Sequence, residues 1–163
     1  MGLDMYLSAV TYCDNHELAG SAERARFRKL MEDVGAGDFS PASSIPYCAV
    51  KLLVADWKNA YAIDRWIVGH SYESGEDAER EIPRENLQKL LELCQHLLQK
   101  KNRREASRLL PPPDNLFRNR EDLEYFEYFW QTGYWCDLKS TIRQISPVLA
   151  KPTFDCWEFY HRS

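Results

Sequence analysis

The stretch Trp57-Lys58-Asn59-Ala60-Tyr61-Ala62-Ile63-Asp64-Arg65-Trp66 carries the pattern that predicts most about this fold. At about 100° per residue, its apolar side chains fall within one arc, as they do on an amphipathic helix. Asp64 projects into the middle of that arc. Because an ionised carboxylate is costly to desolvate alone, we expect Asp64 to meet a cation or hydrogen-bond donors. The stretch therefore predicts a helix that opens at Trp57 and ends near Gly69, with an acid on its apolar face.

Patterns on either side of this stretch predict three strands and about five helices. Alternating or continuous apolar residues favour strands at 3–13, 47–54 and 154–161. Apolar residues three and four apart, with capping residues before them, favour helices at 21–34, 57–69, 83–101, 120–131 and 137–145. In the last two, Gly133 is expected to end the first helix, Asp137 to cap the second and Ser146-Pro147 to interrupt it.

These elements predict an α+β fold with a small, mainly antiparallel sheet, whose N- and C-terminal strands pair. The acidic segment 71–82 reads as a surface loop without the residue ladder of a calcium site. The proline run at 111–113 is a stiff break and the candidate hinge of the chain. Since only about fifty residues follow it, we expect a single domain over 1–163.

Composition and charge exclude several classes of protein. A hydrophobic content of 44% is typical of a soluble domain, and no apolar run approaches the ~18 residues that cross a membrane. The net charge of −4 argues against general nucleic-acid binding, which depends on neutralising phosphates. Five cysteines without a C-x-x-C pair favour reduced thiols in a cytoplasm. Four scattered histidines give no metal-ligand spacing, so we expect neither a metal nor a cofactor.

Candidate site residues come from the central stretch and from two flanking segments. The sequence lacks the Gly-rich phosphate loops, the G-x-S-x-G elbow and the H-E-x-x-H helix of common enzymes. Aromatic rings could stack on a ligand, Lys58 could meet an anion, and Asp64 or Asp137 could act in catalysis. For Asp64, a structural role paired with Lys58, Lys139 or Arg143 is favoured over a catalytic one. The candidate ligand-binding residues are Asp4, Tyr6, Trp57, Lys58, Asn59, Tyr61, Asp64, Tyr134 and Asp137.

The order of several short motifs resembles a largely uncharacterised family of phage and bacterial proteins. That family begins M-G-L-D-[MI]-Y, as Met1 to Tyr6 does here, and continues with a W-R-K-x-N-x-I-H-x-W-like stretch that corresponds to 57–66. An L-L-P segment (109–111), a D-L-K-x-T-I helix (137–142) and an aromatic C-terminal strand follow in the same order. Some members are labelled phosphoglycerate kinase, an enzyme whose two large lobes a chain of 163 residues cannot form.

Two positions depart from the family, and the second affects any mechanism. Lys58 stands where Arg is usual, and Asp64 stands where His is usual. A general base built on that histidine therefore does not transfer directly, although an aspartate can accept a proton in the same place.

The resemblance, the aromatic content of 13% and the missing catalytic motifs together lead us to expect a phage- or prophage-type binding protein. Such a protein would act on a host process, for example against a defence system, by binding a host protein or by sequestering a nucleotide-like signal. A homo-oligomer is left open. The alternative is a small enzyme for a nucleotide or phosphoester, with Asp64 as general base, Asp4 or Asp137 as its partner and Lys58 steadying negative charge.

Overall fold

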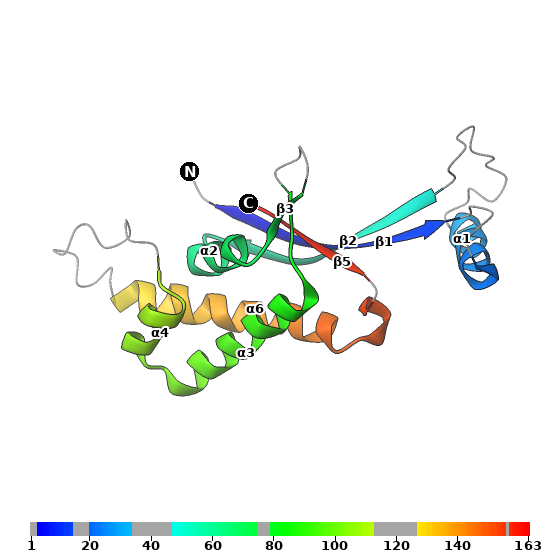
Figure 1. The fold of residues 1–163 in the computed structure, drawn as a ribbon. Helices are drawn as coiled ribbons and strands as arrows, with labels where there is room; N and C mark the ends of the chain where they lie inside the picture. The colour runs from blue at the N-terminus through cyan, green and yellow to red at the C-terminus, as the bar shows by residue number, and fades with distance from the viewer. Residues whose placement is uncertain (1–2, 15–19, 34–46, 75–78, 113–126, 156) are drawn as a thin grey trace. The chain divides into compact units, whose positions relative to one another are not determined.

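The computed structural model describes residues 3–14, 20–33, 47–74, 79–112, 127–155 and 157–163 (Figure 1). The chain divides into two compact units, Val10–Lys51 and a larger one formed by Met1–Ala9 with Leu52–Ser163. The expectation of a single domain with a hinge at 111–113 stays a prediction, because the described residues end there at Pro112. The boundary between the compact units lies elsewhere in the chain, at 9/10 and 51/52.

Five strands form one sheet in the order β2-β1-β5-β4-β3. Their bounds are β1 Asp4–Asp14, β2 Tyr47–Lys58, β3 Tyr72–Ser74, β4 Glu79–Glu81 and β5 Glu158–Arg162. Strand β4 is antiparallel to both its neighbours, with Tyr72 opposite Glu81 and Glu81 opposite Tyr160. The hydrogen-bonded neighbours β1 and β5 confirm that the N- and C-terminal strands pair.

The predicted sheet of about three strands was too small, because β3 and β4 lie in the segment expected to be a loop. Both strands are only three residues long and rich in acids. Their backbone groups are satisfied by each other and by β5, and Ile82 N–H donates to the Phe159 carbonyl at 2.9 Å. Charged side chains are common on edge strands, where they discourage pairing with other chains. The acidic composition of 71–82 therefore favoured a loop, whereas this segment contains two short strands.

Five α-helices lie in the described ranges, together with one π-helix and one 3-10 turn. Helix α1 (Ser21–Asp33) belongs to the smaller unit, where Phe27 is buried. The larger unit holds α2 (Tyr61–Gly69), α3 (Arg84–Lys100), α4 (Arg103–Leu109) and α6 (Trp135–Leu149). The π-helix η2 covers Phe129–Tyr134, and the 3-10 turn η3 covers Pro152–Phe154. None of the helices in the described ranges is long and apolar enough to cross a membrane.

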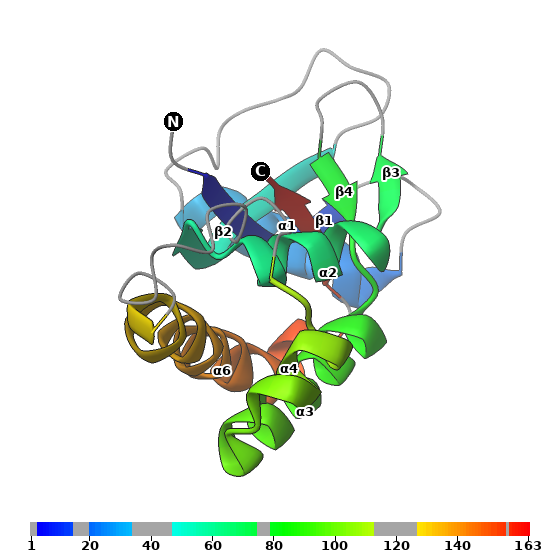
Figure 2. The same cartoon turned by 90° about the vertical axis from the view of Figure 1, so that its left-hand side faces the viewer.

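The core of the larger unit lies between its strands and its helices. Helices α2, α3 and α6 lie on one side of the strands in both views (Figures 1 and 2). Alternate residues of β1, namely Met5, Leu7 and Ala9, are buried. The predicted leucine stripe of α3 is buried with them and packs against α6. Because its strands and helices share this one apolar core, the larger unit gives a fixed frame to the residues between them.

Several predicted element boundaries were wrong, and one of them is the start of the C-terminal strand, which begins at Glu158 and not at 154. Strand β2 continues to Lys58, so Trp57 and Lys58 belong to a strand, and α2 begins only at Tyr61. The alternation of buried Ala55 and Trp57 fits the strand, and it was masked by the helical spacing that follows. Gly133 does not end a helix, because η2 leads directly into α6. Consequently Asp137 lies in the first turn of α6 and is not its cap. The helix expected at 120–131 lies largely outside the described residues.

Pro147 does not interrupt α6, which runs on to Leu149. A proline removes one backbone donor, which matters less in the last turn of a helix than in its middle. Buried Ile145 and Val148 lie on either side of it and hold this turn to the core. Burial of the apolar face thus keeps α6 helical where Ser146-Pro147 predicted an interruption.

Candidate functional site

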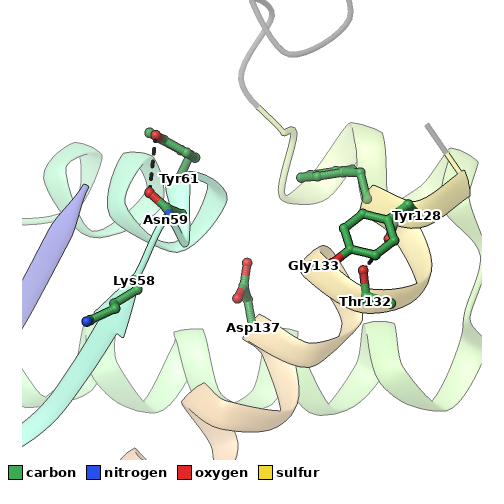
Figure 3. A pocket seen from close by; sticks show the side chains of 8 residues that line it. Lys58, Asn59, Tyr61, Tyr128, Thr132, Gly133 and Asp137 are labelled. Carbon is green, nitrogen blue, oxygen red and sulfur yellow. Dashed lines mark hydrogen bonds between the residues drawn. The ribbon is translucent and has the colours of Figure 1, made fainter. Parts of the chain in front are cut away.

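A pocket of about 300 Å³ opens in the larger unit between the β2–α2 turn and the π-helix region (Figure 3). The turn contributes Lys58, Asn59 and Tyr61. The facing wall comes from the helical segment before and within α6 and consists of Tyr128, Phe129, Thr132, Gly133 and Asp137. Segments about seventy residues apart in the sequence therefore face each other here. Four of the nine candidate ligand-binding residues, Lys58, Asn59, Tyr61 and Asp137, line this pocket.

The β2–α2 turn is held by Asn59, whose φ of 57° places it in the left-handed region. Asparagine tolerates this conformation better than most residues. Its backbone N–H donates to the Leu3 carbonyl at 2.7 Å, and its Oδ1 accepts from the Leu3 N–H at 2.9 Å. The Tyr61 hydroxyl lies 3.5 Å from the same Oδ1. The start of β1 thus fixes the turn that carries three pocket residues.

The opposite wall depends on the π-helix η2. A π-helical turn inserts an extra residue into a helix and frequently occurs at functional sites. Here the Thr132 hydroxyl donates to the Tyr128 carbonyl at 2.7 Å. Gly133 has no side chain, and a Cβ at this position would lie 3.4 Å from Cδ2 of Phe129. The glycine therefore leaves space next to the Phe129 ring on the pocket wall.

Among the described residues that line this pocket, only Asp137 carries a carboxyl group. Its side chain is half-buried, and burial raises the pKa of the carboxyl from 3.8 to about 7. The carboxyl points into the space between Asn59–Tyr61 and Thr132–Gly133 (Figure 3). Among the described residues it has no side-chain hydrogen bond or ion pair. A partly desolvated carboxyl that points into a pocket without a protein partner is suited to meet a ligand.

Two consecutive hydrogen bonds, one buried and one partly buried, position Asp137 relative to β2. The Trp57 indole N–H donates to the Thr141 hydroxyl at 3.0 Å, and that hydroxyl donates to the Asp137 carbonyl at 2.8 Å. On the surface, the Gln144 amide exchanges two 2.8 Å bonds with the Asp56 backbone. Strand β2 and helix α6 are therefore joined at two positions, by Trp57 with Thr141 and by Asp56 with Gln144. Trp57 is 4% exposed and does not line the pocket, so it supports the site from within the core.

Asp64 lies outside the pocket lining and pairs with a histidine. Its Oδ1 is 2.9 Å from Nε2 of His161 on β5, a residue that is 1% exposed. The expectation of a donor or cation for this acid is confirmed. The predicted partners Lys58, Lys139 and Arg143 were wrong, because the inward face of α2 packs against the C-terminal strand. Asp64 therefore joins α2 to β5.

The other candidates lie apart from the pocket. Asp4 and Tyr6 project from the exposed side of β1. Tyr134 is 1% exposed, and its hydroxyl donates to the Leu110 carbonyl at 2.8 Å, so its ring fills the core. In the described part of the chain no group of three or more His, Cys, Asp or Glu residues could hold a metal ion. Cys94 on α3 is buried, which raises the pKa of its thiol to about 12.

Four lining residues were missing from the candidates, namely Tyr128, Phe129, Thr132 and Gly133. The aromatic helix before Gly133 was visible in the sequence, but nothing in its pattern distinguished a pocket wall from a core or an interface. The π-helical turn that opens this wall has no signature in the sequence.

The family resemblance drawn from the motif order stays a prediction, and the function must be argued from the pocket itself. No protein-family model, curated protein or solved structure matches this chain.

Proposed function

We propose that this chain is a non-catalytic binding protein that takes a small, nucleotide-like ligand in the pocket between Lys58 and Asp137. As a phage- or prophage-type protein it would act on a host process by sequestering such a ligand. One observation carries the proposal: aromatic side chains line the same pocket as a half-buried Asp137 carboxyl that has no side-chain partner among the described residues.

The size and lining of the pocket favour a flat molecule over a bulky one. Its volume of about 300 Å³ is at the lower end of the range for ligand pockets. Tyr61, Tyr128 and Phe129 offer ring faces or edges, and stacking of a base on an aromatic ring contributes about 1–3 kcal/mol. Lys58 lies at the turn and makes no ion pair or hydrogen bond with the described residues, which leaves its charge for an anionic group.

The host-directed part of the proposal rests on the sequence. It is supported by the motif order that resembles phage and prophage proteins and by the absence of the common catalytic motifs. A protein that sequesters a signal needs affinity and no chemistry, which agrees with a pocket that has one carboxyl group and no metal-binding cluster among the described residues.

A second candidate function is an enzyme that transfers a proton through Asp137. A general acid or base works best with a pKa near the working pH, and burial raises the pKa of Asp137 to about 7. The residues needed for an Asp64 mechanism are divided in space, since Lys58 and Asp137 line the pocket and Asp64 pairs with His161. This observation favours Asp137 over Asp64 as the reacting group.

Titration of the purified full chain with nucleoside monophosphates, followed by calorimetry, tests the binding proposal. We expect saturable binding that Tyr61→Ala weakens by roughly tenfold through lost stacking. Tyr72→Ala is the matched control, because Tyr72 is exposed on β3 and does not line the pocket. Absence of binding in every titration, or equal loss in both variants, would contradict the proposal.

The same samples separate binding from catalysis. After prolonged incubation, chromatography of the nucleotide should show it unchanged. Conversion that Asp137→Asn abolishes would establish the enzyme instead, whereas conversion that survives in a folded Asp64→Asn variant would eliminate the mechanism based on Asp64.

A further inference from the structure

We propose that the pocket recognises a purine that presents adjacent N–H donors, as the ring N–H and exocyclic amino group of guanine do, through the carboxylate of Asp137 and the hydroxyl of Thr132. This inference rests on the proposed nucleotide binding and adds the identity of the base. It follows from the direction of the hydrogen bonds that the lining residues already make.

Two of the three hydroxyl groups among the described lining residues, those of Thr132 and Tyr61, donate their protons to protein acceptors. Thr132 donates its hydrogen to the Tyr128 carbonyl at 2.7 Å, so only its oxygen lone pairs remain for a ligand. The Tyr61 hydroxyl directs its hydrogen at Asn59 Oδ1 over 3.5 Å, a longer and weaker contact. Toward a ligand, both hydroxyls therefore act chiefly as acceptors.

In its ionised form, Asp137 adds to this acceptor character of the pocket, because a carboxylate can only accept hydrogen bonds. Its two oxygens match two parallel N–H donors on one edge of a planar base, a bidentate geometry that adds specificity as well as binding energy. Figure 3 shows the carboxyl of Asp137 in the space between the two walls, while Thr132 lies on η2, which leads into α6. Adenine presents a ring nitrogen lone pair at the corresponding position, which would face the carboxylate with repulsion.

The donors lie at the opposite end of the pocket. The Leu3 backbone N–H can only donate, so its bond to Asn59 Oδ1 fixes that side-chain oxygen and leaves the Nδ2 group as a donor. Lys58 lies at the same end, and its ammonium group points away from Asp137 and from the space between the two walls (Figure 3). A nucleotide matches this arrangement when the N–H donors of its base face the acceptors near α6 and its phosphate faces the donors at the β2–α2 turn.

This arrangement separates guanine from its close relatives by chemistry alone. Hypoxanthine keeps the ring N–H and lacks the amino group, so one of the two bonds to Asp137 is lost. Xanthine replaces the amino group by a carbonyl, which repels a carboxylate and accepts a hydrogen bond from an amide. Reading of a base by its hydrogen-bonding edge between aromatic side chains is an established mode of base recognition.

Calorimetry with the full chain and the 5′-monophosphates of guanosine, inosine, adenosine and xanthosine tests the inference. We expect guanosine monophosphate to bind most tightly and the other three to bind roughly tenfold or more weakly. The Asp137→Asn variant should bind guanosine monophosphate roughly tenfold or more weakly than the native chain does, and it should bind xanthosine monophosphate more tightly. Asp56→Asn is the control, because Asp56 is exposed and does not line the pocket, and it should keep the native order.

The possible outcomes separate the two proposals. Equal binding of adenosine and guanosine monophosphates, or an order that Asp137→Asn leaves unchanged, would overturn the base assignment while nucleotide binding stands. Binding of none of the four by folded protein would overturn the proposed function and, with it, this inference. The exchange of preference between guanine and xanthine is the decisive result, because a merely destabilising variant would weaken every ligand alike.

Discussion

Trp57 and Thr141 are joined by a buried 3.0 Å hydrogen bond from the indole nitrogen to the hydroxyl oxygen. Trp57 is 4% exposed and Thr141 is fully buried, so water cannot replace either partner. Since the same hydroxyl donates to the Asp137 carbonyl, the bond connects β2 to the turn of α6 that carries the pocket acid. The site therefore depends on a contact that no ligand touches.

Replacement of Thr141 by valine should destabilise the protein by about 1–3 kcal/mol, because the buried indole N–H of Trp57 loses its acceptor. Urea denaturation measures the loss in the free energy of unfolding. Thr153→Val provides the control at an exposed threonine of η3 and should have a much smaller effect. Equal effects of the two substitutions would show that the Trp57–Thr141 bond does not stabilise the core.

The raised pKa of Asp137 predicts a pH dependence of stability. Its folded pKa of about 7 lies above the unfolded value near 3.8, so the folded state holds this proton more tightly. Below about pH 4 the group therefore does not destabilise the protein. Stability falls as the pH rises from about 4 to about 7 and then levels off, by at most about 4 kcal/mol and by less where water in the open pocket solvates the carboxylate.

Denaturant titrations at several pH values measure this effect as the difference between the native chain and Asp137→Asn. The difference should grow in favour of the variant as the pH rises to about 7, since the amide carries no charge. Asp56→Asn, at an exposed carboxylate, should give a difference that does not change in this direction. A flat difference for Asp137→Asn would contradict the raised pKa.

Much of the fold could be predicted because single elements carry strong local patterns. The predicted helix 83–101 differs from α3 by one residue at each end, since its leucines recur at helical spacing and a proline precedes it. The acid at position 64 was correctly expected to need a partner. The identity of that partner could not be predicted, because the contact between α2 and β5 that brings His161 to Asp64 is a tertiary contact, which no local pattern encodes.

The Asp64–His161 pair should stabilise the packing of α2 against β5. In Asp64→Ala the buried Nε2 of His161 loses its 2.9 Å partner, and Nδ1 of the same ring already lacks one among the described residues. We expect a loss of about 1–3 kcal/mol in the free energy of unfolding, measured by urea denaturation. Asp56→Ala removes an exposed carboxylate and should stay close to the native value. If Asp56→Ala lowers the free energy of unfolding as much as Asp64→Ala does, the Asp64–His161 pair does not stabilise this packing.

The pocket was harder to predict than the fold, because it combines a left-handed turn with a π-helix. The sequence marked Lys58, Asn59 and Tyr61 as one side of a site, although it placed Lys58 on a helix. On the other side only Asp137 was predicted, since Gly133 was read as a helix end by the usual preference of glycine for that place. The structure continues through Gly133 because the aromatic residues around it, Trp130 and Tyr134 among them, are buried against the core.

Gly133→Ala separates the pocket from the stability of the fold. The added Cβ would lie 3.4 Å from Phe129 Cδ2, an ordinary van der Waals distance, and glycine is the weaker helix former by about 0.5–1 kcal/mol. We therefore expect unchanged or slightly increased stability by urea denaturation.

The added methyl group nevertheless fills space on the pocket wall. It should lower the affinity for guanosine monophosphate by about tenfold if overpacking costs about 1.4 kcal/mol. Gly69→Ala is the matched control, because a Cβ there meets nothing within 4 Å and Gly69 does not line the pocket. A folded Gly133→Ala variant with native affinity would place the ligand elsewhere on the molecule.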